Sequence, residues 1–303
     1  MFSQNTKQMI IYGAPGTGKS YLLEKSILQN GFLYSDIFRV TLHEDMTYAD
    51  FIGYTTPKIV NNNEISYLFE AGPFTAALVH ALKTNRNTIL IIEELNRGNA
   101  STIFGDIFQL LDRNSSSYSS YPVRNSSIYE YMKDSDCMFP QEYNLADNDI
   151  VIPSNLYIYA TMNTADQNVY PIDSAFKRRF QMMYVPISFD ITNSQLLEID
   201  RISKMYIFNN LKTWSDFAKK INSIIDSINI ENNLISEDKK LGPFFVEKED
   251  VLSKQAFCDK VIYYLKHDVF KYDNNYFRLS YDEIFEQFVE NNNDIFIVLG
   301  IGG

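Results

Sequence analysis

Apolar residues in the first 186 positions form two kinds of segment. Five segments have the length and composition of strands: 9–12, 37–42, 88–92, 155–161 and 179–185. The run 88–92 is continuously apolar, which is typical of a central parallel strand buried on both faces. Between these segments apolar residues recur at helical spacing: Leu22, Leu23, Ile27 and Leu28 predict one helix, and Ile103, Ile107, Leu110 and Leu111 predict another after residue 99. The alternation predicts an α/β domain whose parallel sheet carries helices on both sides.

The pattern changes after Pro186, where helical spacing dominates. Over 215–229 apolar residues follow helix spacing closely, and shorter patterns of the same kind lie at 255–266 and 281–290. We therefore expect an α/β domain over 1–186 and a smaller, mainly helical domain over 187–303. Within the first domain, residues 113–149 are too long for an ordinary connection and are predicted to be an insertion with partial order. Three asparagines at 61–63 predict the turn of a hairpin.

A phosphate-binding loop is predicted directly after the first strand. Its residues are Gly13, Ala14, Pro15, Gly16, Thr17, Gly18, Lys19 and Ser20. They match G-x-x-x-x-G-K-S, and the strand before them and the amphipathic segment after them distinguish this loop from a chance glycine-rich turn. Backbone N–H groups and the N-terminus of the next helix would bind phosphate oxygens. Lys19 would reach the β- and γ-phosphates, and the Ser20 hydroxyl would take a Mg²⁺ position.

Two carboxylates follow the central strand. Glu93 and Glu94 stand at its carboxyl end, which is where open α/β sheets bind ligands. By position we expect Glu93 on the metal side and Glu94 as the group that orients or activates the attacking water. Asp is usual at the first position, so Glu93 is a departure that would alter metal affinity. Taken without the phosphate loop, the pair is equally typical of an exposed acidic strand end.

Polar and basic residues follow the next strand. Asn163 is expected to hydrogen-bond the γ-phosphate or the attacking water, and the alternative is an asparagine that only forms a turn. Lys177, Arg178 and Arg179 form a basic cluster near a predicted helix end. An arginine that faces a neighbouring subunit's nucleotide would stabilise transition-state charge. A solvated basic turn explains the cluster equally well.

Composition restricts the partners and the cellular location that we expect for this protein. The chain has 303 residues and a net charge of −11, which argues against DNA binding by the whole surface but leaves a local basic strip open. Cys137 and Cys258 are its two cysteines, so we expect neither a zinc site nor a disulfide. The low cysteine content is typical of a protein in a reducing compartment. No apolar run approaches membrane-spanning length and no secretory segment precedes the loop, so we expect a cytoplasmic protein.

In this order, the motifs resemble those of an AAA+ motor (a P-loop NTPase). Within that superfamily they are similar to the McrB type, the GTP-hydrolysing motor subunit of methylcytosine-specific restriction systems. The most diagnostic segments are Glu94-Leu95-Asn96-Arg97-Gly98-Asn99 and Met162-Asn163-Thr164-Ala165-Asp166. Supporting matches are 43–53, 71–74 and Leu241-Gly242-Pro243-Phe244-Phe245. The likeness is strongest over 9–180.

The resemblance implies an AAA+ αβα sandwich followed by a helical lid, assembled as a ring that is commonly hexameric. The nucleotide would lie between subunits, so that Arg178 or Arg179 acts on a neighbour's phosphate. Asn163 would be the sensor asparagine. The loop Asn163, Thr164, Ala165 and Asp166 would couple hydrolysis to an endonuclease partner of the McrC type. Gln167 stands where the family loop usually continues with Arg, which puts the mode of coupling in question.

Several alternatives stay open. The family's nucleotide is GTP, but no Asn-Lys-x-Asp guanine motif is present, so ATP is not excluded. The leading hypothesis is a motor of a restriction or antiphage defence system that drives a nuclease on DNA read by another domain or chain. A dynein-related or MoxR-like ATPase that remodels proteins, and a nucleotide-gated assembly scaffold with little turnover, are the alternatives. The chain would be either a motor-only protein or an excised motor domain, and the 113–149 insertion either a surface loop or a pore or partner contact.

Overall fold

The computed structural model describes residues 6–60, 64–137, 139, 143–164, 169–189, 205, 213–232, 239–271 and 276–300. The chain separates into two compact units. Residues 1–12 and 19–184 form the first unit, and residues 13–18 and 185–303 form the second. The domain boundary expected at residue 186 stays a prediction.

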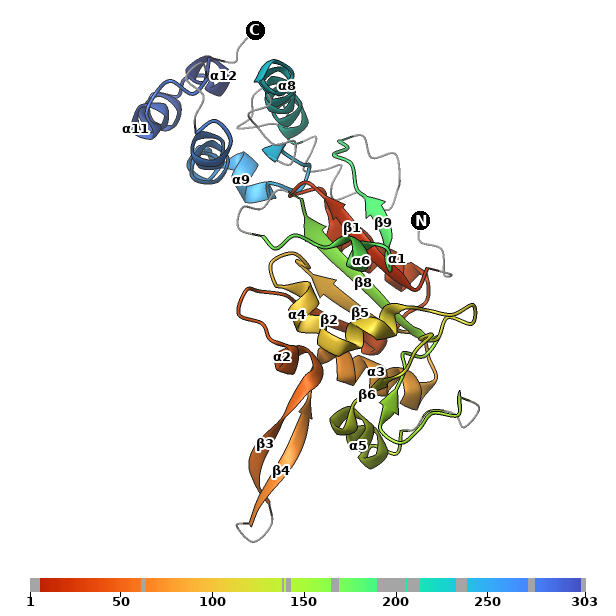
Figure 1. Ribbon diagram of the computed structural model, residues 1–303. Coiled ribbons are helices and arrows are strands. Elements are labelled where there is room, and N and C mark those ends of the chain that lie inside the picture. Colours follow the sequence, from red (N-terminus) through yellow and green to blue (C-terminus); the bar gives the residue numbers. More distant parts are fainter. Residues whose placement is uncertain are drawn as a thin grey trace. The chain divides into compact units, whose positions relative to one another are not determined.

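A five-stranded parallel sheet is the centre of the first unit (Figure 1). In spatial order its strands are β2 (Ile37–Thr41), β5 (Thr88–Glu93), β8 (Leu156–Asn163), β1 (Gln8–Gly13) and β9 (Gln181–Tyr184). All six residues of β5 are buried, as its continuous apolar run predicts. The five segments expected to be strands are these five, so the α/β prediction is confirmed.

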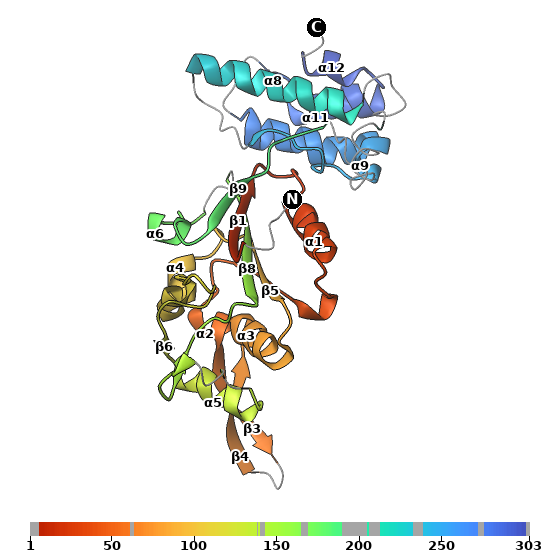
Figure 2. The same cartoon turned by 90° about the vertical axis from the view of Figure 1, so that its right-hand side faces the viewer.

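Helices cover both faces of this sheet. In Figure 2, α1 (Lys19–Gln29) lies on one side and α4 (Ala100–Phe104) and α6 (Ser174–Lys177) lie on the other. On the face opposite α1, Leu90 and Ile92 share a core with Phe74 and Leu78 of α3 (Pro73–Thr84). Because side chains alternate along a strand, Ile91 is buried on the face of α1.

The helix expected after residue 99 differs from the prediction. It divides into α4 and a 3₁₀ segment, η3 (Gly105–Leu111). Gly105 adopts a left-handed φ of 50°, which interrupts the α-helical hydrogen bonds. A Cβ at this position would lie 2.8 Å from Cδ2 of Tyr48, so the break also makes room for that ring.

Two further pieces of structure are inserted in the first unit. The helix α2 (Tyr48–Ile52) leads into an antiparallel hairpin of β3 (Gly53–Val60) and β4 (Glu64–Ala71). The predicted turn at 61–63 lies outside the described residues. The expected 113–149 insertion contains β6 (Val123–Arg124), α5 (Ser126–Asp134) and β7 (Asp149–Ile150). Its Ile128 and Met132 are buried in the same core as β5, so these parts of the insertion are packed structure.

The second unit is helical in its described parts. Its helices are α8 (Trp214–Asn232), α9 (Lys248–Leu252), α10 (Lys254–Phe257), α11 (Tyr281–Phe285) and α12 (Ile295–Val298). Two π-helical segments, η8 (Cys258–Ile262) and η9 (Leu265–Val269), follow α10, and η10 (Glu286–Glu290) follows α11. The three helical patterns expected here all fall on helices. Among the described residues, no helix has both the length and the apolarity needed to cross a membrane.

Candidate functional site

The phosphate loop has the backbone that its glycines predict. Gly16 and Gly18 have left-handed φ values of 70° and 82°, a region that residues with a Cβ rarely adopt. The Thr17 hydroxyl donates to the carbonyl of Ala14 at 3.0 Å and closes the turn. Lys19 is the first residue of α1, and it is 8% exposed. The sequence match is therefore a compact loop that runs into a helix N-terminus.

Within the second unit, the segment Leu241–Phe245 lies against this loop. The Phe244 N–H donates to the Gly16 carbonyl at 2.8 Å. A Cβ at Gly18 would overlap the ring of Phe244, so a larger residue there would have to displace that ring and adopt a strained φ. Asn222 of α8 holds the segment, because it donates to the Leu241 carbonyl at 2.9 Å and accepts from the Leu241 N–H at 2.7 Å.

Glu93 ends β5 in a buried polar cluster. Oε2 of Glu93 accepts from the Ser20 hydroxyl of α1 at 2.9 Å and from the Thr161 hydroxyl of β8. Oε1 forms an ion pair with Nη1 of Arg39 at 2.7 Å. Nη2 of Arg39 is paired with Glu24 of α1 at 2.8 Å. Both oxygens of the Glu93 carboxylate are thus oriented by side chains from three elements.

Strand register explains how these residues meet. Thr41 of β2 is level with Glu93, so Arg39, two residues earlier, is on the same face of the sheet. Ile92 is level with Ala160 of β8, which places Thr161 beside Glu93. Because Glu93 and Arg39 both bond to residues of α1, this is the face that α1 covers.

Glu94 has an unusual backbone and its own set of partners. Its φ of 55° is left-handed, which is strained for a residue with a Cβ. The amide Nδ2 of Asn163 donates to both carboxylate oxygens, at 3.0 and 3.1 Å. Nε of Arg97 pairs with the same carboxylate at 3.2 Å. The carboxylate is 29% exposed, so it is held in place while still open to solvent.

Asn96 ties the two strand ends together. Its Nδ2 donates to the Asn163 carbonyl at 2.6 Å, and its own carbonyl accepts from the Tyr170 N–H at 2.7 Å. Asn96 is 5% exposed, and its Oδ1 has no partner among the described atoms. The loop after β5 is thereby fixed to the end of β8.

The two predicted arginines have different environments. Arg179 is inward-facing: it pairs with Asp112 at 2.6 Å, donates to the Ala175 carbonyl at 3.0 Å and lies over the ring of Phe108 at 4.2 Å. Arg178 is exposed. The contacts of Arg179 are those of a residue that fixes α6 to η3, whereas Arg178 is accessible from outside the unit.

Of the predicted site residues, the structure brings together Ser20, Glu93, Glu94 and Asn163. Thr164 directly follows β8, and Ala165, Asp166 and Gln167 of the signature loop lie outside the described residues. Sequence reasoning assigned no role to Arg39, Thr161 or Asn96. Arg39 could have been noticed because it is a charged residue within a predicted strand. Thr161 could have been noticed because it lies two residues before Asn163 and so shares its face of the strand.

The donor set around Ser20 and Glu93 fits Mg²⁺. Mg²⁺ prefers oxygen ligands and is usually held by one or two protein oxygens together with substrate phosphates and water. Ser20 Oγ and Glu93 Oε2 are such oxygens, 2.9 Å apart. In the part of the chain that the structure describes, no three His, Cys, Asp or Glu side chains gather to form another metal site.

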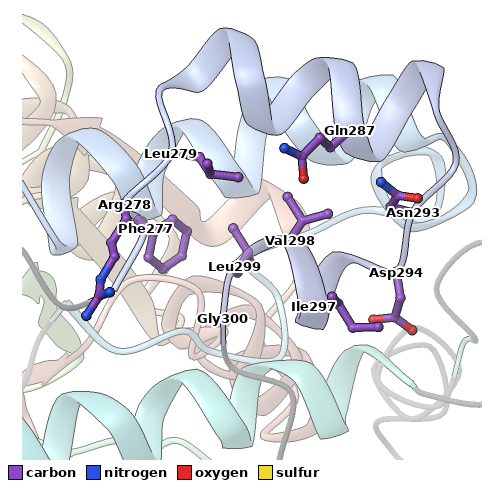
Figure 3. Close-up of a pocket in the computed structure, with 10 residues that line it drawn as sticks. All are labelled: Phe277, Arg278, Leu279, Gln287, Asn293, Asp294, Ile297, Val298, Leu299 and Gly300. Carbon is purple, nitrogen blue, oxygen red and sulfur yellow. The ribbon is translucent and has the colours of Figure 1, made fainter.

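A separate cavity of about 740 Å³ lies in the second unit (Figure 3). Phe277, Val298 and Leu299 line it together with polar Arg278 and Asp294. Of the predicted site residues that the structure describes, none lines this cavity.

Comparison with known proteins agrees with this geometry. The model of the AAA domain family, dynein-related subfamily, matches residues 8–180. The Type II restriction enzyme BsuMI component YdiS of Bacillus subtilis (strain 168) is 38% identical, over 88% of this chain and 80% of that protein. The Type IV methyl-directed restriction enzyme EcoKMcrB subunit of Escherichia coli (strain K12) is 24% identical over 78% of this chain. The alignment with that subunit covers 46% of its length, so the chain spans about half of it.

A crystal structure described as that of an ATPase candidate from Cytophaga hutchinsonii covers 86% of this chain and 72% of its own, at 15% identity. Its TM-score of 0.36 is too low to support a conclusion about the fold. The family match extends over more than half of the chain, and the relative at 38% identity covers most of it. The chain therefore belongs to the dynein-related subfamily of AAA domains and, within it, to the McrB type.

Proposed function

We propose that this chain is the nucleotide-driven motor of a restriction system, a Mg²⁺-dependent nucleoside triphosphatase that acts with an endonuclease subunit of the McrC type. The observation that carries the proposal is the joining of Ser20, Glu93, Glu94 and Asn163 at one end of the sheet, next in sequence to the phosphate loop. The names of the two relatives, both components of restriction enzymes, support the proposal that the motor belongs to a restriction system. DNA would be engaged through another domain or chain.

In this proposal the site residues have separate roles in nucleotide binding, metal binding and hydrolysis. The loop 13–18 and Lys19 bind the triphosphate, and Ser20 with Glu93 holds Mg²⁺, which when bound neutralises phosphate charge. Glu94 orients the attacking water and accepts its proton, and Asn163 keeps that carboxylate in place. The partly exposed carboxylate of Glu94 supports this role, because it is positioned and yet reachable by water.

The proposed assembly is a ring, a hexamer as is common for the family, with each nucleotide between two subunits. Arg178 is the better candidate for the arginine that acts on a neighbour's nucleotide, because it is exposed while Arg179 is engaged with Asp112. We propose GTP as the substrate on the basis of the resemblance to the McrB type, and ATP is the alternative. The loop 163–166 is proposed to couple hydrolysis to the nuclease.

Hydrolysis measurements test the proposal. Purified protein with Mg²⁺ should hydrolyse GTP, or ATP in the alternative, faster when the nuclease subunit is present. Glu94→Gln should keep nucleotide binding but lose turnover by orders of magnitude, while Lys19→Ala should lose binding. Glu130→Gln, a change on the exposed surface of α5, is the matched control and should hydrolyse normally. Normal turnover by Glu94→Gln would show that another group orients the water.

The same assay separates the alternatives. A nucleotide-gated scaffold is supported by the tight pairing of Glu94 with Asn163 and Arg97, and it predicts binding with negligible turnover even with the nuclease present. For action between subunits, an Arg178→Ala protein mixed with a Lys19→Ala protein should regain activity. In a mixed ring, an interface that takes its phosphate loop from the Arg178→Ala protein and its arginine from the Lys19→Ala protein has both groups intact. Lack of recovery would place the required arginine elsewhere.

A further inference from the structure

We propose that Arg39 is a positioning residue for the metal-side carboxylate, and that it allows a glutamate to serve where an aspartate is usual. The inference rests on the proposed function, since it concerns the same Mg²⁺ position. It assigns a role to a charged residue in the middle of β2 that the phosphate-loop chemistry does not itself require.

Glutamate at position 93 poses a geometric difficulty. Its side chain is one methylene longer than that of aspartate and has one more rotatable bond, so the carboxylate has more positions available relative to Ser20. Without orientation, the longer side chain would spend less time with an oxygen beside the Ser20 hydroxyl. Something must therefore restrict its torsions if it is to act as a metal-side group.

Arg39 supplies that restriction. Its Nη1 contacts Oε1 of Glu93 at 2.7 Å, the short distance of a charge-assisted hydrogen bond. This leaves Oε2 as the oxygen that accepts from the hydroxyls of Ser20 and Thr161. The Glu93 side chain is 12% exposed, so solvent screens the pair less than it would at the surface.

The guanidinium is itself fixed. Its Nη2 is paired with Glu24 at 2.8 Å, so its planar fork spans two carboxylates. Glu24 and Ser20 are both on α1, four residues apart, and therefore lie on one face of that helix. Arg39 thus links β5 to the same helix turn that presents the Ser20 hydroxyl. A lysine, with one compact ammonium group, would satisfy these two partners less well.

The test measures Mg²⁺ dependence of nucleotide binding without any hydrolysis. Fluorescent, non-hydrolysable GTP and ATP analogues are titrated into the wild type and Arg39→Met at a series of Mg²⁺ concentrations and in excess EDTA. We expect Arg39→Met to need about tenfold more Mg²⁺ for half of the Mg²⁺-dependent increase in analogue affinity. Loss of a residue that orients a metal ligand usually weakens metal affinity by about 10–100-fold, so this is the lower end of that range. In EDTA its affinity should equal that of the wild type. Arg39→Lys should be intermediate, and it also provides a second variant if Arg39→Met does not fold.

A double variant makes the test specific. Adding Glu93→Asp to Arg39→Met should restore the Mg²⁺ requirement to within about threefold of the wild type, because the shorter side chain needs no outside support. Arg124→Met, which removes an exposed arginine from β6, is the control. Equal Mg²⁺ titrations for the wild type and both Arg39 variants would overturn the inference alone. Weaker binding in EDTA and in Mg²⁺ alike would also overturn it, by showing a general structural role. A wild type that binds neither analogue would overturn the proposed function as well.

Discussion

Arg113 is a buried cation with five hydrogen bonds, and its replacement should be among the most damaging changes in the first unit. Its acceptors are Gln8 Oε1 at 2.6 Å and the carbonyls of Ser117 at 3.0 Å, Ile152 at 3.3 Å, Pro153 at 3.1 Å and Leu156 at 2.9 Å. No carboxylate is among these partners. Burial lowers the pKa of the guanidinium to about 9, so Arg113 remains charged at neutral pH. It connects the starts of β1 and β8, the strands that lead to the phosphate loop and to Asn163.

The expected loss can be worked out from these bonds. A hydrogen bond from a charged donor contributes about 1.5–3 kcal/mol, but the bonds of one group do not add. Counting only the two shortest, to Gln8 and Leu156, Arg113→Met should lower the free energy of unfolding by about 4 kcal/mol. That corresponds to a fall of roughly 8–16 °C in Tm for a unit of this size. Arg113→Lys keeps the charge and up to three donors, so its loss should be about half as large.

Thermal and urea unfolding followed by far-ultraviolet circular dichroism measure this loss. Arg124→Met is again the matched control, and it should stay within about 0.5 kcal/mol of the wild type, as exposed positions usually do. A loss below about 1 kcal/mol for Arg113→Met would refute the reasoning. It would mean that desolvation of the cation cancels what its hydrogen bonds contribute.

Three further predictions follow from buried polar contacts. Burial raises the pKa of Asp36, but hydrogen bonds from His80 and Arg86 outweigh it and leave the pKa lowered, so Asp36→Asn should destabilise the protein at pH 7. In urea unfolding from pH 7 to 3 this difference should shrink below about pH 4, where the unfolded carboxyl is protonated; a constant difference would contradict the pairing. Asn96→Ala should lower kcat severalfold and change KM less, because the loop after β5 loses its hydrogen bond to the end of β8. An unchanged kcat would show that this bond is dispensable. Asn222→Leu should weaken nucleotide-analogue binding by freeing 241–245 from α8; unchanged binding would show that α8 does not order that segment.

Local patterns made much of the fold predictable. A continuous apolar run such as 88–92 identifies a buried strand from its own residues, and the phosphate loop is a contiguous motif with fixed glycine positions. The helix after residue 99 was predicted as one piece because its apolar spacing continues through Gly105. That spacing does not report the left-handed φ at Gly105, which depends on the approach of the Tyr48 ring from another element.

Sequence patterns could not predict which residues contact the site residues. Arg39 and Glu93 are separated by 54 positions, and they meet only because β2 is next to β5 in a register that levels Thr41 with Glu93. Sheet order and register arise from the packing of the whole unit, which no local window contains. The same holds for Arg113, which the sequence places at the start of an insertion and the structure places among buried carbonyls.

The backbone at Glu94 explains how two adjacent carboxylates can both contact the end of β8. In a regular strand Glu94 would point to the face opposite Glu93, because side chains alternate. Asn163 is two residues beyond Thr161 and so shares the face of Glu93, which would leave Glu94 away from it. The left-handed φ of 55° ends the alternation and turns the Glu94 carboxylate to the Asn163 amide. Such a conformation costs about 1–3 kcal/mol and persists where its surroundings determine it, here through the ties of this loop to the end of β8. The strained backbone therefore accounts for two neighbouring glutamates that both contact β8, Glu93 through Thr161 and Glu94 through Asn163.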